Sequence, residues 1–241
     1  MNDGLSNSSS SSGNADRQSI LQELANNMTY VQGGTFTMGA TGEQEAEAEE
    51  NEKPAHSVTL KNFYICKYEV TQELWQAVMG NNPSEFKGNR KPVECVSWDD
   101  CQTFISKLDS LTGKKYRLPS EAEWEFAARG GIKSKGYKYS GSNTLAEVAW
   151  YDGNSGETTH DVGTKQSNEL GLYDMSGNVW EWCNDRYGNY NKSTGCSSQI
   201  LRVYRGGSWY DIAKFGRLSY RSSFGSVNRY CNIGLRLCLS E

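Results

Sequence analysis

Three stretches of the chain combine the apolar spacing of an amphipathic helix with a capping residue in front. They are QELWQAVM after Thr71, the run from Trp98 to Leu111 after Ser97, and EAEWEFAA after Ser120. Ser97 and Ser120 each have an acidic residue three positions later, which is the pattern of a capping box. We predict helices in these three places, ending at Gly80, Gly113 and Gly130.

Residues 29–39 (TYVQGGTFTMG) alternate β-forming residues around a Gly-Gly pair, which predicts a hairpin, and residues 57–70 predict a further strand-like run. Beyond residue 130 the chain is rich in Gly, Asn and Ser, with short aromatic runs between them. Such a segment takes its order from tertiary contacts. Helices early and irregular strands late indicate an α+β fold.

The start of the chain has a different pattern. Residues 1–16 (MNDGLSNSSSSSGNAD) contain almost no apolar side chains, so burial cannot offset the entropy of ordering them. We expect a flexible tether with a short helix near Ile20–Leu24, together spanning 1–27, followed by a single domain over 28–241. A length of 241 residues fits one domain.

Charge and hydropathy exclude two classes of partner. The net charge of −4 argues against nucleic acid, which requires a basic face, and no apolar run approaches the ~20 residues of a membrane span. An acidic run is expected to be a solvated loop without a function. It consists of Glu43, Glu45, Glu47, Glu49, Glu50 and Glu52.

The seven cysteines are odd in number and include no CxxC pair, and only His56 and His160 accompany them. A zinc site is therefore not expected. In an oxidising compartment, Cys183 and Cys196 would close the nearest plausible disulfide loop, but spacing alone does not fix the connectivity.

Five motifs in order are similar to those of the formylglycine-generating, sulfatase-modifying factor family. They are YVQGGTFTMG (30–39), PAHSVTLKNFYICKYEVTQELW (54–75), RLPSEAEWEFAARGG (117–131), GLYDMSGNVWEW (171–182) and RVYRGGSW (202–209). The resemblance covers about residues 29–240 and implies an elaborated C-type-lectin-like fold. Trp124, Trp180 and Trp182 have the density of core anchors within these motifs.

The resemblance also implies where the family's oxidase carries its two copper-binding cysteines. In RGGSWYDIAKFGRLSYR these positions fall on Asp211 and Gly216, neither of which replaces a thiolate. We therefore expect no copper and no enzyme activity. The related iron-dependent sulfoxide synthases need a multi-histidine site, and a serine hydrolase needs a nucleophile turn such as GxSxG; the sequence has neither.

One metal signal remains in GNVWEW (177–182), which resembles the family's calcium-binding loop. Side-chain oxygens of Asn178 and Glu181, with adjacent backbone carbonyls, would suit Ca²⁺. In the alternative interpretation, Asn178 satisfies a turn and Glu181 pairs with a nearby Trp or Arg.

From Arg205 onward the chain is similar to the variable proteins of diversity-generating retroelements, in which fixed framework residues alternate with diversified ones. Mutation of adenines in Asn codons allows Tyr, Asp, Phe, Gly, Ser, Val and Cys, but not Lys, Glu, Gln, Met or Trp. All twelve non-framework positions obey this restriction, and Tyr with Ser and Gly is the composition of an antibody-like binding surface. The expected ligand-binding residues are Tyr210, Asp211, Phe215, Gly216, Ser222, Ser223, Phe224, Val227, Tyr230 and Cys231.

The sequence thus predicts a non-catalytic ligand-binding protein whose partner is a protein or another surface ligand. The alternative is a formylglycine-generating or related oxidoreductase whose catalytic residues lie at other positions in the chain. The Ser-rich start resembles the spacer of an exported or lipid-anchored protein, so we expect a location at the cell surface or in the periplasm, with any lipid anchor upstream of residue 1.

Overall fold

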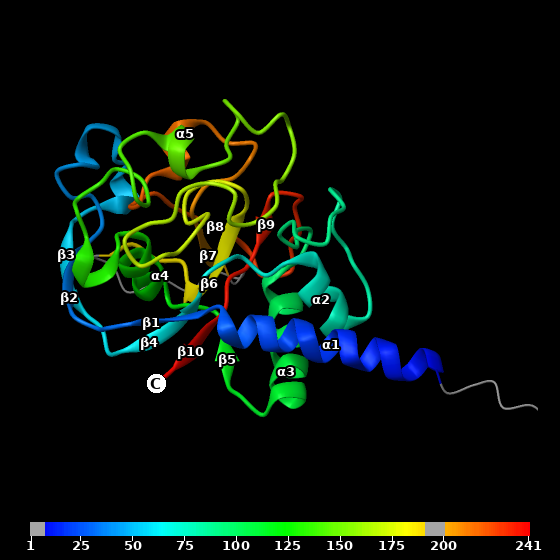
Figure 1. Ribbon diagram of the computed structural model, residues 1–241. Helices are drawn as coiled ribbons and strands as arrows, with labels where there is room; N and C mark the ends of the chain where they lie inside the picture. The colour runs from blue at the N-terminus through cyan, green and yellow to red at the C-terminus, as the bar shows by residue number, and fades with distance from the viewer. Residues whose placement is uncertain (1–7, 191–200) are drawn as a thin grey trace, which may run out of the picture.

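The structure is a computed structural model that describes residues 8–190 and 201–241 (Figure 1). Its helices are α1 (Ser8–Asn26), α2 (Gln72–Met79), α3 (Trp98–Thr112), α4 (Glu121–Ala128) and α5 (Leu145–Val148). Short 3-10 helices are η1 (Glu45–Glu47), η2 (Glu50–Glu52), η3 (Gly131–Lys133) and η4 (Ala213–Gly216). The strands are β1 (Met28–Val31), β2 (Thr35–Met38), β3 (His56–Thr59), β4 (Phe63–Cys66), β5 (Tyr116–Arg117), β6 (Trp180–Arg186), β7 (Leu201–Arg205), β8 (Arg221–Gly225), β9 (Ile233–Gly234) and β10 (Cys238–Ser240).

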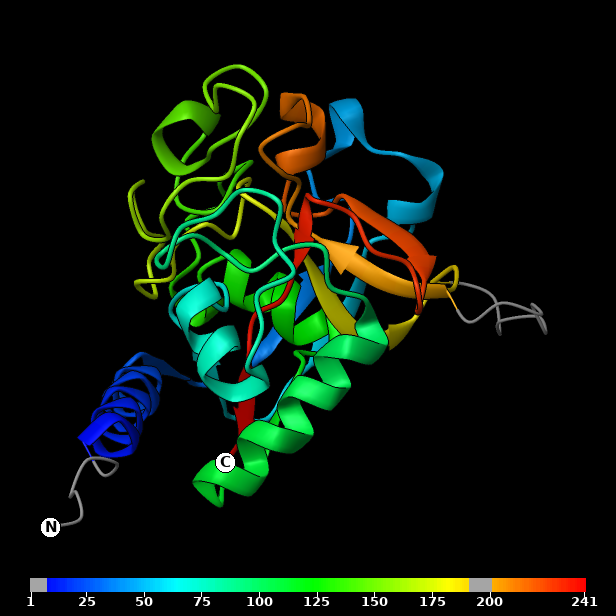
Figure 2. The same cartoon turned by 90° about the vertical axis from the view of Figure 1, so that its right-hand side faces the viewer.

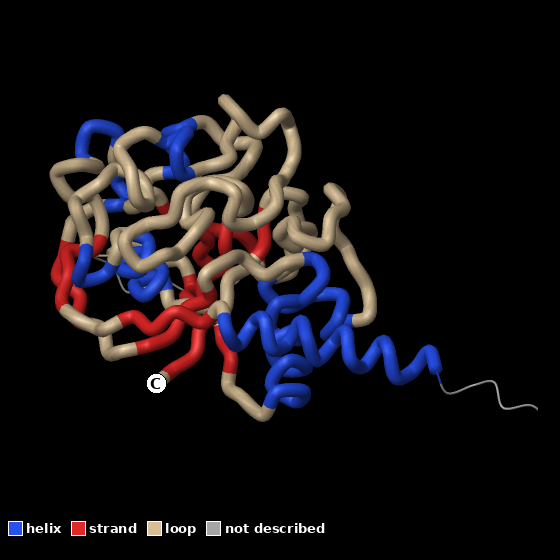
Figure 3. The backbone as a smooth tube through the Cα atoms, in the orientation of Figure 1, coloured by secondary structure: helices blue, strands red, loops and turns tan. Residues whose placement is uncertain are grey.

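These strands form two four-stranded sheets, in the orders β1-β4-β10-β5 and β8-β7-β6-β9, and a two-stranded ribbon, β2-β3. All pairings are antiparallel except that of β6 with β9. Figure 1 shows α1, α2 and α3 gathered at the lower right of the molecule, and loops make up most of its upper part (Figure 3). The arrangement confirms the predicted α+β class.

The three predicted helices are confirmed together with their caps. Thr71 accepts a hydrogen bond from the Leu74 amide at the start of α2. At α3 and α4 the capping is reciprocal: at α3 the Ser97 hydroxyl accepts from the Asp100 amide at 3.1 Å, and the Asp100 carboxylate accepts from the Ser97 amide at 2.9 Å. Gly80 ends α2 with a left-handed backbone, which glycine adopts without strain.

The first helix is longer than predicted. α1 begins at Ser8, within the stretch expected to be a flexible tether, rather than near Ile20. Leu21 and Leu24 are buried in the same core cluster as α2 and α3, and Glu23 forms an ion pair of 2.6 Å with Arg90. The hydrophobic core therefore includes residues that precede the predicted domain boundary at residue 28.

The predicted hairpin over 29–39 is wrong. β1 pairs with β4 and β2 pairs with β3, so the two strands flanking the Gly-Gly pair lie in different sheets. The Gly33 amide donates to the Asn62 side chain at 3.0 Å, and a Cβ on Gly33 would lie 2.3 Å from the Leu60 carbonyl oxygen. Close approach of the 60–62 segment, not a hairpin turn, explains this glycine.

The acidic run is also not a simple solvated loop. Glu52 is fully buried against Arg217, at 2.7 Å. The other ion pairs of the run are Glu43 with Arg129 at 2.6 Å, Glu47 with Lys138 at 2.9 Å and with Arg217 at 3.7 Å, Glu49 with Lys214 at 2.5 Å and Glu50 with Lys53 at 3.1 Å. These ion pairs therefore hold the loop around η1 and η2 against the rest of the molecule.

Trp124, Trp180 and Trp182 are buried, as predicted for core anchors. Trp180 and Trp182 belong to the cluster that joins α1–α3 to the C-terminal strands, and Trp124 belongs to a second cluster around α4. The candidate disulfide partner Cys196 lies outside the described residues, so the pairing with Cys183 stays a prediction. In the described part of the chain, no helix is long and apolar enough to cross a membrane.

Candidate functional site

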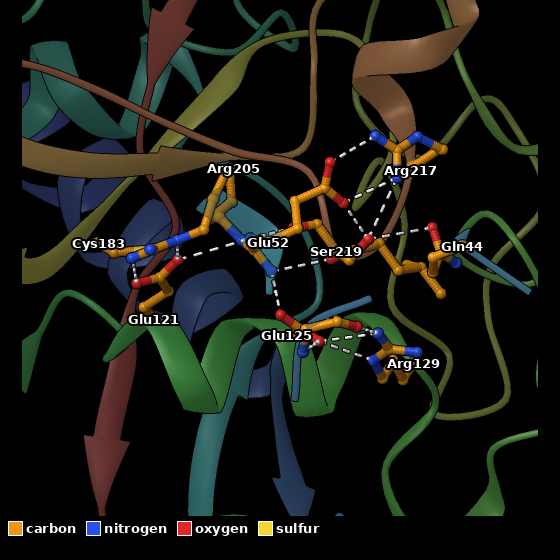
Figure 4. A network of polar contacts seen from close by, with 12 residues as sticks. Gln44, Glu52, Glu121, Glu125, Arg129, Cys183, Arg205, Arg217 and Ser219 are labelled. Atoms are coloured by element: carbon orange, nitrogen blue, oxygen red, sulfur yellow. Dashed lines mark hydrogen bonds and ion pairs between the residues drawn. The ribbon is translucent and has the colours of Figure 1, made fainter. Parts of the chain in front are cut away.

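Four fully or almost fully buried arginines hold the C-terminal segment in place, and we call them the arginine framework: Arg205, Arg217, Arg221 and Arg236. Each pairs with a glutamate from an earlier part of the chain. Arg205 contacts Glu125 of α4, and Arg217 binds both oxygens of Glu52 at 2.7 and 2.8 Å (Figure 4).

The other two pairs are equally enclosed. Arg221 binds both oxygens of Glu121 at 2.6 and 2.7 Å, and Arg236 contacts Glu181 at 2.6 Å. Removing one partner of such a pair leaves an uncompensated buried charge, which typically costs about 3–5 kcal/mol. Burial alone would raise the pKa of Glu52, but hydrogen bonds from Arg217 hold it below its ordinary value. The framework therefore fixes the path of the backbone between residues 205 and 236.

The β8-β7-β6-β9 sheet has two chemically different faces because successive side chains on a strand point to opposite sides. Glu181, Arg205 and Arg221 are cross-strand neighbours and share one face. Trp182, Tyr204 and Ser222 are cross-strand neighbours on the other. The ion pairs and the aromatic side chains are thereby separated by the thickness of a single sheet.

The second face borders a pocket of about 510 Å³, which we call the aromatic pocket. It is lined by Trp180, Tyr204, Trp209, Tyr210, Asp211, Phe215, Tyr220, Ser222, Phe224, Tyr230, Cys231, Asn232 and Ile233. In Figure 2 the orange and red segments from η4 to β9 lie together on this sheet. The pocket thus collects side chains from β6, β7, β8 and the loops around η4 and β9.

Seven of the ten predicted ligand-binding residues line the aromatic pocket: Tyr210, Asp211, Phe215, Ser222, Phe224, Tyr230 and Cys231. Tyr210 and Tyr230 are 67% and 53% exposed. The structure therefore brings most of the sequence candidates together around one cavity.

Three predicted residues do not line the pocket. Ser223 alternates with Ser222 and Phe224 along β8, so it belongs to the face of the arginine framework. Gly216 is buried, and its backbone lies 3.0 Å from where a Cβ on Gly207 would be. Val227 is exposed on the turn that follows β8.

Six lining residues were not among the sequence candidates: Trp180, Tyr204, Trp209, Tyr220, Asn232 and Ile233. The four aromatic residues among them were not predicted to line a pocket because aromatic residues in regular motifs indicate core packing. Trp180 and Trp209 are indeed buried, but their edges also border the cavity. Core and pocket share these side chains.

Asp211 is the acidic residue of the pocket. Its Oδ2 accepts hydrogen bonds from Trp180 Nε1 at 2.8 Å and from the Ser208 hydroxyl. Its Oδ1 has no hydrogen-bond partner among the described residues. Burial raises the pKa of Asp211, against the lowering effect of these two donors.

The thiols near the pocket are not activated. Burial raises the pKa of Cys231, which lines the pocket, and raises the pKa of the nearby Cys95 to about 12. A thiolate is the form that attacks substrates and binds soft metals. These two cysteines are therefore protonated thiols at neutral pH.

The contacts of Asn178 and Glu181 do not fit a calcium ion. Glu181 accepts hydrogen bonds from Arg236 and, at 2.7 Å, from Trp124 Nε1. Asn178 Oδ1 accepts from the His160 amide at 3.0 Å, and its amide group donates to Glu69 at 2.7 Å. Over residues 8–190 and 201–241, no group of three or more His, Cys, Asp or Glu could hold a metal ion. Calcium binding remains an untested prediction, and the contacts correspond to the alternative interpretation.

Comparison with known proteins gives matches over nearly the whole chain. The model of the sulfatase-modifying factor enzyme 1-like domain matches residues 15–240. The solved Treponema denticola variable protein 1 has 32% identity and a TM-score of 0.78, over 89% of this chain and 95% of that one. The chaperone protein LppX of Paenibacillus barcinonensis is 34% identical over 90% of this chain and 91% of its own length.

A third relative is the inactive C-alpha-formylglycine-generating enzyme 2 of Bos taurus, which is 35% identical over 60% of this chain. The aligned region spans about half of that protein, 47% of its length. The likeness to the variable protein confirms the predicted elaborated C-type-lectin-like fold. The resemblance inferred from the five motifs is confirmed, and the chain belongs to the formylglycine-generating, sulfatase-modifying factor family.

Proposed function

We propose that this protein is a non-catalytic ligand-binding protein whose C-terminal segment carries a diversified binding surface, as in the variable proteins of diversity-generating retroelements. The observation that carries the proposal is the two-faced sheet. Arg205 and Arg221 of the arginine framework lie on one face, and seven of the twelve non-framework positions border the aromatic pocket on the other. Substitution in the pocket can then proceed without touching the buried ion pairs.

Two observations support the absence of catalysis. The family resemblance places Asp211 and Gly216 at the positions of the oxidase's two copper-binding cysteines, and Asp211 accepts hydrogen bonds from Trp180 and Ser208. The protonated Cys231 and Cys95 offer no thiolate in their place. We infer that the protein holds no copper.

The relatives support both parts of the proposal. One solved relative is called a variable protein, and one relative in sequence is called an inactive member of the family. The ligand is a protein or another surface molecule, and we place its recognition at the cell surface or in the periplasm. Labelling of intact cells with a membrane-impermeant reagent would test that location.

Sequencing this gene and its surroundings in many cells of one population tests the proposed function. We expect variation at adenine-derived codons for the twelve non-framework positions, 210–211, 215–216, 222–227 and 230–231, and none at the codons of the arginine framework. A neighbouring reverse transcriptase with a near-copy template repeat should accompany it. Uniform codons beside a sulfatase gene would contradict the proposal.

An activity assay tests the enzymatic alternative. With copper and oxygen, the protein should convert no cysteine to formylglycine in a sulfatase-motif peptide. An active member of the family serves as the positive control. Product above the blank without protein would favour the oxidoreductase.

A further inference from the structure

The aromatic pocket has an unusual balance of side chains. Eight of its thirteen lining residues are aromatic, from Trp180 in β6 to Tyr230 before β9. Among the described residues, Asp211 is its one lining carboxylate, and no lining residue is Lys, Arg or His. A cavity of this composition has negative aromatic faces and a negative carboxylate, with no positive side chain in its wall to balance them.

Asp211 is fixed in place but not neutralised. Trp180 Nε1 and the Ser208 hydroxyl both reach Oδ2, and they hold the carboxylate in one orientation. Oδ1 has no partner among the described residues, although the side chain is partly buried. This differs from the framework glutamates, each of which contacts a guanidinium.

Aromatic rings line the same pocket as this carboxylate and meet one another in several orientations. Trp180 is edge-on to Tyr204, with ring centroids 4.8 Å apart, and Phe215 is edge-on to Tyr220 at 4.8 Å. Trp209 and Tyr210 meet at 5.4 Å. Because neighbouring rings are steeply inclined to each other, they cannot all present their faces to the cavity.

We propose, on the basis of the binding role proposed above, that the aromatic pocket binds an organic cation, an ammonium or guanidinium group presented by the ligand, with Asp211 as counter-ion. Aromatic faces attract such cations, and the attraction strengthens when water is excluded. A carboxylate adds a charge-assisted contact. A neutral ligand of the same shape would cover Asp211 and leave its Oδ1 without a partner, which is unfavourable.

Two small molecules of nearly identical shape test the charge directly. Choline and its neutral isostere 3,3-dimethylbutan-1-ol differ in one atom, nitrogen against carbon. Isothermal titration calorimetry should show choline binding at least about tenfold more tightly than the isostere. Butylammonium and ethylguanidinium form a second arm, in which tighter binding than choline indicates a Lys or Arg side chain as the natural group, and weaker binding indicates a quaternary headgroup.

Matched variants locate the effect at Asp211. In Asp211→Asn the amide oxygen still accepts from Trp180 and Ser208, so the fold is kept while the charge is lost. The preference for choline over the isostere should fall to about threefold or less. Asp152→Asn removes an exposed carboxylate near Asp211 but outside the pocket, and it should leave the preference unchanged.

Several results would overturn the proposal. Equal binding of choline and the isostere would indicate an apolar pocket, and failure of the folded protein to bind any of the four probes, or a preference for neutral sugars, would exclude an organic cation. So would an unchanged preference in Asp211→Asn. The codon survey is independent of these outcomes: a diversified gene without cation preference leaves the proposed function standing, whereas uniform codons contradict it whatever the titration shows.

Discussion

Arg217 and Arg229 both form ion pairs in the C-terminal segment, but their surroundings differ. Arg217 is fully buried and binds Glu52, whereas the side chain of Arg229 is 53% exposed and binds Asp100 at 2.6 Å. Arg217→Ala strands the Glu52 carboxylate in the core, so we expect a loss of about 3–5 kcal/mol in the free energy of unfolding.

The matched control is Arg229→Ala, which should cost less than about 1 kcal/mol because solvent screens the exposed pair. Urea denaturation of both variants measures the difference. Adding Glu52→Gln to Arg217→Ala should recover part of the loss by removing the stranded charge. Similar costs for Arg217→Ala and Arg229→Ala would mean that the arginine framework does not support the segment.

Asp174 gives a pH dependence with a definite sign. Burial is the main cause that raises its pKa to about 6, and its buried Oδ1 has no hydrogen-bond partner among the described residues. The neighbouring charged groups are Glu69, Glu181 and Arg236. The folded state therefore keeps this proton to a higher pH than the unfolded chain does, and its contribution makes stability fall as the pH rises from about 4 to 6.

Asp174→Asn should flatten this fall and raise the free energy of unfolding at pH 7 by about 1–3 kcal/mol. Asn tolerates the left-handed backbone of residue 174, where φ is 58°, and its side-chain oxygen still accepts from the Gly163 amide. Denaturation curves at pH 4 and pH 7 provide the comparison. A variant less stable than the parent at pH 7 would show that the carboxylate is required in its charged form.

Seven of the ten predicted ligand-binding residues line the aromatic pocket. They were predictable because the similarity to the variable proteins separates framework from non-framework positions in the C-terminal segment. The predictions that failed depended on the alternation of side chains along a strand and on partners far away in the sequence. Ser223 looked equivalent to Ser222 in sequence, but the alternation of β8 separates them. Glu52 looked like part of a solvated run, because its partner Arg217 lies far along the chain.

At the scale of elements, α1 provides a further prediction. Leu24 is 4% exposed in the core cluster shared with α2 and α3, whereas Gln22 on the same helix is exposed. Leu24→Ala should lower the free energy of unfolding by about 2–4 kcal/mol, through lost burial and the cavity left behind. Gln22→Ala should change it by less than about 0.5 kcal/mol.

Thermal or urea denaturation of these two variants would decide whether α1 is part of the domain. Equal stability of both variants would indicate that the domain begins at residue 28, as the sequence predicted. The helices α2, α3 and α4 were predictable because their caps are local signals. The hairpin was not, because the partners of β1 and β2 lie beyond residue 55 and only the tertiary fold selects them.

At the scale of the whole molecule, the contacts of Asn178 and Glu181 predict how the protein responds to chelators. The oxygens of Asn178 and Glu181 already accept hydrogen bonds from His160, Trp124 and Arg236. An ion that does not bind the folded state cannot stabilise it by mass action. The melting temperature should therefore shift by less than about 1 °C between excess EDTA and excess calcium. A clearly lower melting temperature in EDTA would indicate that the folded protein binds calcium, as the sequence predicted.

The molecule as a whole combines a fixed scaffold with a pocket that can change. Arg205 and Arg221 of the arginine framework pair with α4 on one side of the β8-β7-β6-β9 sheet, and the aromatic pocket borders the other side, which also carries Trp182. A family fold was predictable from five ordered motifs. The separation of scaffold and pocket by a single sheet was not, because no local signal in the sequence reports which face a residue occupies.

A stability scan over residues 205–237 tests this division most directly. Alanine at Arg205, Leu235 or Leu237 should cost about 2–5 kcal/mol, because all three are fully buried. At the exposed Tyr210 and Tyr230 the cost should be below about 0.5 kcal/mol, and at the half-buried Phe215 and Phe224 about 1–2 kcal/mol. Costs at these four pocket positions as large as those of the scaffold would show that they are core, and would contradict a binding surface that is free to vary.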